Sequence, residues 1–224
     1  CLGDSCCPDI DRRASITKNI NSMFITLDGI DGVGKSTQME NLSQFLRSLG
    51  HEVLVVRDPG SSVVGAKLRQ LLLESDLEMH CRTEAMLFMA SRCEMIEKTI
   101  RPALTQGVTV LSDRFLLANV VYQSIGGEVS SAELWELGLL ANGNLKPDLT
   151  LLLDMPAESS IKRLEGPADR MESRGVDYLE SVRQAFLREL PNSSPATAVI
   201  NADQSPQQVT DQVLTQVQAL LDAR

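Results

Sequence analysis

The residues with the clearest chemical purpose form the loop Gly-Ile-Asp-Gly-Val-Gly-Lys-Ser at positions 29–36. Its spacing matches the G-x-x-x-x-G-K-[ST] pattern of a phosphate-binding loop. The glycines let successive backbone N–H groups turn toward phosphate oxygens. Lys35 brings a positive charge to the β- and γ-phosphates, and the Ser36 hydroxyl suits Mg²⁺. An apolar run precedes the loop and a helical pattern follows it, which disfavours a Gly-rich turn that binds nothing.

Further candidate residues lie near the expected strands and on one apolar helix. Asp113 follows a strand, the usual place for a carboxylate that steadies Mg²⁺, although a helix cap would use the same residue. Arg114 could hold a phosphate bidentately or form a surface ion pair. Arg92 lies in an apolar helix, where a guanidinium is costly without an anion or a hydrogen-bond partner. Phe88 is one turn earlier, so a flat base could stack on Phe88 while Arg92 bonds its edge; ordinary core packing also explains Phe88.

A charged segment at 162–170 mixes glycine and proline with lysine and arginine. We interpret it as a lid that brings arginine to a transferring phosphoryl group; the alternative is an exposed loop with incidental charges. Two basic regions beside a phosphate loop predict a phosphorylated donor and a phosphorylated acceptor, and hence phosphoryl transfer rather than simple ATP hydrolysis. A GTPase is disfavoured because the sequence has no Asn-Lys-x-Asp guanine-reading motif, and Asp113 is not followed by the x-x-Gly of a switch loop.

Composition limits the other classes of function. The chain has 224 residues, 43% of them hydrophobic, and a formal net charge of −9, which disfavours a broad basic face for nucleic acid. No apolar stretch approaches the roughly 18 residues of a membrane span, and residues 1–22 lack the apolar centre of a signal peptide. We therefore expect no nucleic-acid or membrane partner. The five cysteines are expected to be free thiols in a reducing cytosol.

Alternating strand and helix patterns must position these residues. Apolar runs predict five strands at about 23–28, 53–56, 108–111, 149–153 and 197–200. Helical spacing predicts helices at about 35–49, 64–73, 83–103, 130–143, 157–164 and 179–190, and a terminal helix capped at Ser205. Strands separated by helices favour a parallel sheet covered on both faces. Ligands of such sheets bind at the carboxyl ends of the strands, so the phosphate loop, 58–60 and Asp113-Arg114 should meet in one cleft.

Two expectations concern the ends of the chain and its longest helix. Residues 1–22 are expected to be a disordered extension before a single domain, 23–224, because they are polar and precede the first strand. The segment 85–90 is apolar all round, so we expect it to be buried on most sides. One side would face the core and another a partner subunit.

The order and spacing of these motifs resemble the thymidylate kinase family from Met23 to the C-terminal helix. The matching motifs are Asp28-Gly29-Ile30-Asp31-Gly32-Val33-Gly34-Lys35-Ser36-Thr37, Asp58-Pro59-Gly60, Arg69, Leu87-Phe88-Met89-Ala90-Ser91-Arg92, Asp113-Arg114-Phe115, Val121-Tyr122-Gln123 and Asp169-Arg170-Met171-Glu172. The resemblance implies an α/β, three-layer P-loop NTPase fold with a five-stranded parallel sheet. It also implies Mg²⁺-dependent transfer from ATP to dTMP by a cytoplasmic homodimer that pairs through the long apolar helix.

The resemblance further implies roles for individual residues. The residues of the ATP site would be Gly29, Ile30, Asp31, Gly32, Val33, Gly34, Lys35, Ser36 and Thr37. The residues of the dTMP site would be Asp31 near the sugar, Pro59, Arg69, Phe88 on the thymine, Arg92 at its edge, Arg114, Asn119, Tyr122 and Gln123. Mg²⁺ would be held by Ser36 and Asp113. The catalytic residues would be Lys35, Asp31, Arg114 and two arginines of a lid at about 165–174, Arg163 and Arg170.

The chain also departs from the family pattern. Asp28 and Asp58 stand where glutamate is usual, and Phe115 stands where tyrosine is usual. The phosphate loop carries no arginine, so the chain resembles the branch of the family that supplies this charge from the lid. Two alternatives remain beside the main interpretation. One is a kinase for a nucleoside or another nucleotide, and the other is a degenerate paralogue that binds nucleotide without transfer.

Overall fold

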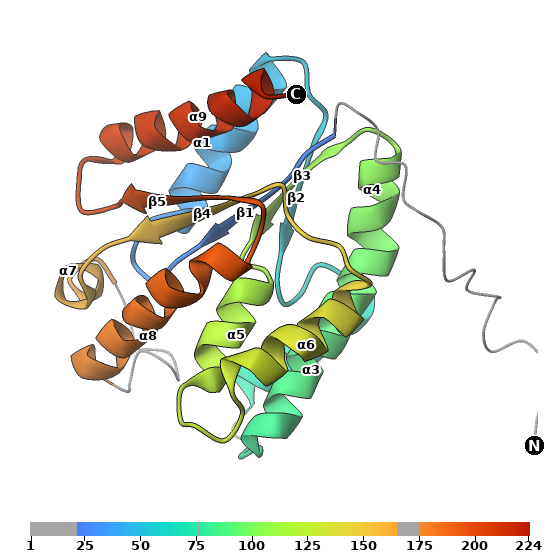
Figure 1. Ribbon diagram of the computed structural model, residues 1–224, viewed down its shortest axis with the longest axis vertical. Coiled ribbons are helices and arrows are strands. Elements are labelled where there is room, and N and C mark those ends of the chain that lie inside the picture. The colour runs from blue at the N-terminus through green and yellow to red at the C-terminus, as the bar shows by residue number, and fades with distance from the viewer. Residues whose placement is uncertain (1–21, 76, 165–174) are drawn as a thin grey trace, which may run out of the picture.

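The computed structural model describes residues 22–75, 77–164 and 175–224 (Figure 1). Five strands form one sheet in which every neighbouring pair is parallel, in the order β2-β3-β1-β4-β5. The strands are β1 Phe24–Asp28, β2 Val53–Arg57, β3 Thr109–Asp113, β4 Leu149–Asp154 and β5 Ala196–Asn201. The predicted five-stranded parallel sheet is therefore confirmed.

Helices cover both faces of this sheet, with α1 and α9 on one face and α3, α5, α6 and α8 on the other (Figure 1). The helices are α1 Lys35–Ser48, α2 Val63–Arg69, α3 Cys81–Met95, α4 Arg101–Thr105, α5 Leu116–Ser124, α6 Ser131–Asn142, α7 Ala157–Ile161, α8 Val176–Glu189 and α9 Pro206–Asp222. Short π-helical turns follow α2 at Gln70–Glu74 and α3 at Ile96–Ile100. The arrangement is the three-layer P-loop NTPase fold.

The central strand β1 explains where the site must lie. All five of its residues are buried, because neighbours cover both of its edges and helices cover both faces. In the register of the sheet, Leu27 lies beside Asp113 of β3, and Arg57 of β2 lies beside the same aspartate. The strands share one direction, so their carboxyl ends meet at one edge. Loops leaving this edge carry the candidate residues.

Capping residues in the sequence determine where two helices begin. Ser130 Oγ accepts a hydrogen bond from the backbone N–H of Glu133 at 3.3 Å, and Glu133 Oε2 accepts one from the N–H of Ser130 at 2.8 Å. The same reciprocal pair, between Ser205 and Gln208, opens α9. Each cap satisfies backbone donors that the helix leaves unpaired and contributes about 1 kcal/mol. Both predicted helix starts are confirmed.

Helix α5 was not predicted from the sequence. Seven of its nine residues are buried, so it lacks the polar face whose spacing marks an amphipathic helix. The expected helix at 157–164 also ends sooner, at Ile161. In the single chain the segment 85–90 is buried on one side, and the expected burial of another side by a partner subunit stays a prediction. Met86 is 60% exposed while Met89 is 3% exposed, because only one side of α3 packs on the protein.

Parts of the expected domain layout lie outside the described residues. The predicted N-terminal extension falls there except for Ser22, which is buried and donates to the carbonyl oxygen of Leu104 at 3.1 Å. The whole of the predicted lid, 165–174, also falls there. Among the helices that are described, none has the length and apolar character needed to cross a membrane.

Candidate active site

The phosphate loop connects β1 to α1, and its backbone leaves no space for side chains at two glycines. Gly29 has φ +141°, and a Cβ there would lie 2.5 Å from the carbonyl oxygen of Leu153. Gly32 has φ +79°, and a Cβ there would lie 2.4 Å from the carbonyl oxygen of Ser160. Both distances are far below van der Waals contact, so β4 and α7 press directly on the loop. The packing explains why these positions require glycine.

Lys35 begins α1, and its side chain folds back over the loop. Its Nζ donates to the carbonyl oxygens of Gly29 at 3.1 Å and Ile30 at 2.8 Å, and it lies 3.2 Å from Asp31 Oδ1. Burial, together with the nearby positive charge of Arg114, lowers the pKa of Lys35 to about 8. The loop therefore holds a buried ammonium at the positive end of a helix, the arrangement that attracts a phosphate.

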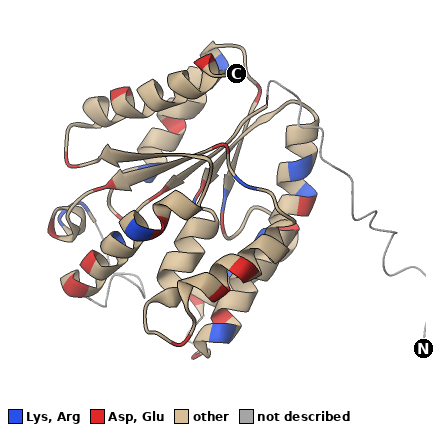
Figure 2. Ribbon diagram, viewed as in Figure 1, with Lys and Arg blue, Asp and Glu red and all other residues tan. Residues whose placement is uncertain are grey.

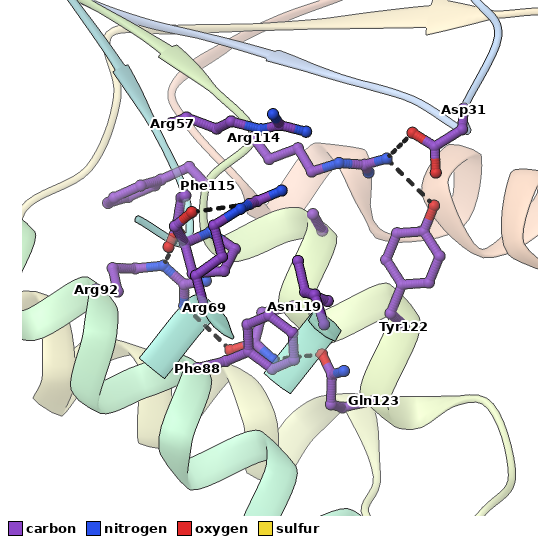
Figure 3. A pocket seen from close by; sticks show the side chains of 14 residues that line it. Asp31, Arg57, Arg69, Phe88, Arg92, Arg114, Phe115, Asn119, Tyr122 and Gln123 are labelled. Atoms are coloured by element: carbon purple, nitrogen blue, oxygen red, sulfur yellow. Dashed lines mark hydrogen bonds and ion pairs between the residues drawn. The ribbon is translucent and has the colours of Figure 1, made fainter. Parts of the chain in front are cut away.

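Asp31, Arg114 and Tyr122 form a connected chain beside the loop (Figure 3). Arg114 Nη2 donates to Asp31 Oδ1 at 2.7 Å and to the Tyr122 hydroxyl at 3.4 Å. The guanidinium also lies 5.1 Å from the centre of the Tyr122 ring, within cation–π range. Burial favours the neutral form of Asp31, but Arg114 and Lys35 outweigh it and hold the pKa of this carboxyl well below its usual range. Asp31 is therefore ionised at neutral pH.

Arg114 also has an unused donor. Its Nη1 is buried and has no hydrogen-bond partner among the described residues. Its backbone has φ +67°, a conformation that is uncommon outside glycine and is found at functional sites. The backbone is held there because the N–H of Arg114 donates to Leu27 at 2.9 Å and Ser112 Oγ donates to the carbonyl of Arg114 at 2.6 Å. Buried guanidinium donors are normally paired, so this one is suited to an anionic ligand.

Arg92 is 1% exposed, and a polar network accounts for its burial. Its Nε donates to Asp58 Oδ2 at 2.5 Å, and its Nη1 donates to Asn119 Oδ1 at 3.1 Å. Asn119 Nδ2 in turn donates to Gln123 Oε1 at 2.5 Å. The network joins the turn after β2 to helices α3 and α5. Arg92 thus has the hydrogen-bond partner that the sequence analysis required.

One pocket collects the predicted acceptor residues (Figure 3). Its lining residues are Asp31, Arg57, Asp58, Pro59, Arg69, Leu73, Phe88, Arg92, Arg114, Phe115, Ala118, Asn119, Tyr122 and Gln123. All nine positions expected for the acceptor site are among them. Arg69 is oriented by donating from Nη1 to the carbonyl oxygen of Pro59 at 3.0 Å. The pocket opens next to the phosphate loop because Asp31 belongs to both.

Five lining residues were not predicted as site residues: Arg57, Asp58, Leu73, Phe115 and Ala118. Arg57 is the last residue of β2, and its Nε lies 3.6 Å from Asp113 Oδ2. Ligands bind at the carboxyl ends of parallel strands, so the position of Arg57 in the sequence could have indicated a site residue. The burial of Arg92 signalled that an acid lies within reach, but it did not identify Asp58 as that acid. Phe115 follows Asp113-Arg114 in a motif, which was a usable signal, whereas Leu73 and Ala118 carry no signal that separates them from core residues.

The carboxylates beside the loop fit a hydrated divalent cation. Asp113 Oδ1 and both carboxyl oxygens of Asp28 are buried without a hydrogen-bond partner among the described residues. Burial raises the pKa of Asp28 to about 6, although Arg114 and Lys35 oppose this shift. Carboxylate oxygens are the ligands that Mg²⁺ prefers. Ser36, which is exposed in the first turn of α1, adds a hydroxyl on the loop side, so the predicted metal ligands fit Mg²⁺.

Of the two expected lid arginines, the structure describes Arg163, and its contacts lie away from the acceptor pocket. Arg163 Nη1 donates to the carbonyl oxygen of Ala202 at 3.2 Å, and its Nη2 lies 3.8 Å from Asp203 Oδ1. The side chain therefore contacts the segment after β5 and does not line the acceptor pocket. Arg170 and the rest of the predicted lid lie outside the described residues.

Comparisons with known proteins agree with this geometry. A family model described as thymidylate kinase matches residues 27–213. A thymidylate kinase of Rhodopirellula baltica is 67% identical over 190 residues, which cover 85% of this chain and 78% of the relative. A thymidylate kinase of Bifidobacterium longum subsp. infantis is 41% identical over 206 residues, which cover 90% of this chain and 88% of the relative. A thymidylate kinase of Desulforudis audaxviator is 39% identical over 209 residues, which cover 92% of this chain and 94% of the relative. The chain belongs to the thymidylate kinase family.

Proposed function

We propose that the protein transfers the γ-phosphoryl group of ATP to dTMP, giving dTDP and ADP. The observation that carries this proposal is the shared position of Arg114. Its guanidinium contacts Asp31 of the phosphate loop and Tyr122 of the acceptor pocket, and its buried Nη1 remains available. The guanidinium therefore lies between the phosphate loop and the acceptor pocket. A cation in this position can stabilise the negative charge of a phosphoryl group during its transfer from donor to acceptor.

The acceptor pocket suits thymine. Phe88 offers a ring face for stacking, and it lies on α3 one turn before Arg92. Because Asp58 and Asn119 hold the guanidinium of Arg92, its remaining N–H groups are fixed in direction for a base carbonyl. Asn119 adds amide hydrogen-bonding capacity at the same wall. Asp31 would contact the deoxyribose near its 3′-hydroxyl, and Arg69 would join Arg114 at the acceptor phosphate.

Transfer would proceed by positioning and charge stabilisation. An oxygen of the acceptor phosphate attacks the γ-phosphorus in line, and the bond to the β-phosphate oxygen breaks. Lys35 holds the β- and γ-phosphates of the donor, and Arg114 stabilises the negative charge on the moving group. Ser36 and Asp113 would hold Mg²⁺, which when bound neutralises charge on the β- and γ-oxygens. Arg170 is kept in the proposal as a lid arginine, whereas the contacts of Arg163 do not place it near the acceptor.

The proposed setting is a cytoplasmic homodimer. Apolar side chains are exposed on the two neighbouring helices α3 and α6, where Met86 is 60% and Leu140 is 80% exposed. Exposed apolar residues that gather on packed helices mark interaction surfaces. No nucleic-acid partner is proposed, because the chain is acidic and its basic residues are interspersed with acidic ones (Figure 2).

An acceptor panel tests the proposed reaction. ADP production is measured with thymidine, dTMP, dUMP, UMP and GMP at equal concentrations, with ATP and Mg²⁺ in excess. The proposal predicts the highest kcat/KM with dTMP. A higher value with thymidine would support a nucleoside kinase instead. If ATP binds and none of the acceptors is turned over, the protein is a degenerate nucleotide-binding paralogue.

A further inference from the structure

A second cluster of metal-ligating side chains lies away from the active site, where the start of α3 meets the loop between α5 and α6. It consists of His80, Cys81 and Glu128, and one ligand atom of each residue lies within 4.8 Å of the other two. His80 Nε2 is 3.3 Å from Glu128 Oε2, and Cys81 Sγ donates to the same oxygen at 2.7 Å. None of the three lines the acceptor pocket.

We propose that His80, Cys81 and Glu128 bind a transition-metal ion of the Zn²⁺ type, distinct from the Mg²⁺ of the reaction. The donor set supports this class of metal, because a thiolate, an imidazole and a carboxylate suit Zn²⁺, whereas Mg²⁺ prefers oxygen ligands alone. With the thiol deprotonated, two negative charges offset the charge of the dication. A water molecule would complete four-fold coordination.

One separation of the donor atoms already matches a tetrahedral site, and the sulfur–oxygen separation must widen. Two ligands held about 2.0 Å from Zn²⁺ lie about 3.3 Å apart, which is the observed separation of His80 Nε2 and Glu128 Oε2. The sulfur and carboxylate oxygen must move apart by about 1 Å, since a hydrogen bond between them is replaced by two metal bonds. All three residues are solvent-accessible, so these small movements meet no core packing.

Two neighbouring groups set the conditions for binding. His80 Nδ1 accepts a hydrogen bond from the backbone N–H of Arg82 at 3.3 Å. Ligation through Nε2 requires the proton on Nδ1, so the metal replaces this helix cap. The hydrogen bond to Glu128 raises the pKa of the Cys81 thiol, and a bound metal must displace that proton. Metal binding is therefore expected to strengthen as pH rises.

The position of the cluster predicts what the metal does. Cys81 begins α3, the helix that carries Phe88 and Arg92, and Glu128 follows α5, the helix that carries Tyr122 and Gln123. A metal at this point joins the outer ends of the two helices that wall the acceptor pocket (Figure 1). The ion would act as a structural clip, so phosphoryl transfer itself does not require it.

Cobalt binding to the full chain tests the site. Cys1, Cys6 and Cys7 are replaced by serine in every variant, which leaves Cys81 and Cys93 as the only thiols. The probe is Co²⁺, whose bond to a thiolate gives a charge-transfer absorption that Co²⁺ at the carboxylate and hydroxyl ligands of the Mg²⁺ site cannot give. Zn²⁺ is then added to displace it. We expect one Co²⁺ per chain with this absorption, and its loss in Cys81→Ser.

Three further variants complete the test. His80→Ala and Glu128→Gln should each weaken Co²⁺ binding by about 100-fold or more, since removing even an outer partner of a metal ligand costs about 10–100-fold. Cys93→Ser is the matched control, because it removes an exposed thiol from the same helix and should change nothing. Circular dichroism confirms that each variant is folded. The proposal is overturned if the absorption is missing, if it needs Cys93, or if it persists unchanged in His80→Ala and Glu128→Gln.

Discussion

The guanidinium of Arg92 and the carboxylate of Asp58 form a buried ion pair, with Nε 2.5 Å from Oδ2 and both side chains at most 2% exposed. The pair connects the turn after β2 to the last turn of α3. Arg92 reaches Asn119 through another nitrogen, so Asp58 fixes the orientation of the group proposed to bond the thymine edge.

This relationship predicts that Asp58→Asn raises the KM for dTMP by about 10–100-fold, with a smaller effect on ATP binding. The reason is that the amide retains the shape but leaves the charge of Arg92 uncompensated, which also costs stability, by about 3–5 kcal/mol at the upper limit. Steady-state kinetics with dTMP varied, and calorimetric titration with ATP, measure the two effects. Asp58→Glu serves as the conservative variant and should retain most of the dTMP affinity. Equal losses for both substrates in Asp58→Asn would contradict the orienting role.

Arg114→Ala is expected to lower kcat by about 100–1,000-fold, the range found when one preorganised donor to a reacting group is lost. Arg114→Lys keeps a positive charge but loses the planar fork that reaches Asp31 and the acceptor phosphate together, so kcat should recover only in part. Steady-state turnover at saturating ATP and dTMP measures both variants. Full activity in Arg114→Lys would show that a point charge is sufficient, and would contradict the bidentate role.

Asp28 predicts a pH dependence of stability. Burial raises its pKa from 3.8 to about 6, so the folded state favours the neutral carboxyl. The stabilisation is complete below the unfolded pKa and is lost as pH rises through about 6. Asp28→Asn removes this titration, so its free energy of unfolding relative to wild type should increase between pH 4 and pH 7 by up to about 3 kcal/mol.

Urea unfolding without nucleotide or Mg²⁺ measures this difference, since both ligands would bind the folded state and hide it. The control is Asp211→Asn, which makes the same substitution at an exposed position of α9. A pH-independent difference for Asp28→Asn would contradict the prediction.

Alanine substitutions at two glycines with nearly equal φ angles distinguish the effect of a steric clash from the effect of backbone strain. Gly32 has φ +79° and its added Cβ would meet Ser160 at 2.4 Å, whereas Gly127 has φ +83° and open space. Gly127→Ala should cost about 1–2 kcal/mol, the usual strain of a left-handed residue with a Cβ. Gly32→Ala should cost more and should also abolish tight ATP binding, because the loop must move away from α7. Similar ATP affinities in the two variants would contradict a loop held by packing.

The sequence predicted most of the fold because its signals are local. Apolar runs marked every strand, and the Ser130 and Ser205 capping boxes marked two helix starts. Helix α5 gave no such signal, because it is buried on nearly all sides. The apolar segment at 85–90 predicted one side on the core and another on a partner subunit. The structure shows the buried side, and the partner contact of the exposed side stays a prediction.

The sequence predicted which residues form the candidate site better than it predicted the contacts between them. Motif spacing pointed to Arg92 and Arg114, and the parallel sheet placed Arg114 at the same edge as the phosphate loop. The sequence could not predict that Asp58 would be the partner of Arg92, since that contact depends on how the turn after β2 lies against α3. Arg163 shows the same limit, because its contact with Ala202 arises from the packing of a segment 39 residues away in the chain.

The proposed activity is the transfer of a phosphoryl group from ATP to dTMP. Chromatographic measurement of dTDP and ADP over time, in a reaction of purified protein with ATP, dTMP and Mg²⁺, tests it most directly. We expect one dTDP for each ADP, with the formation of both slowed by about 100–1,000-fold in Arg114→Ala. ADP formed without dTDP, or no ADP from a protein that binds ATP, would contradict it.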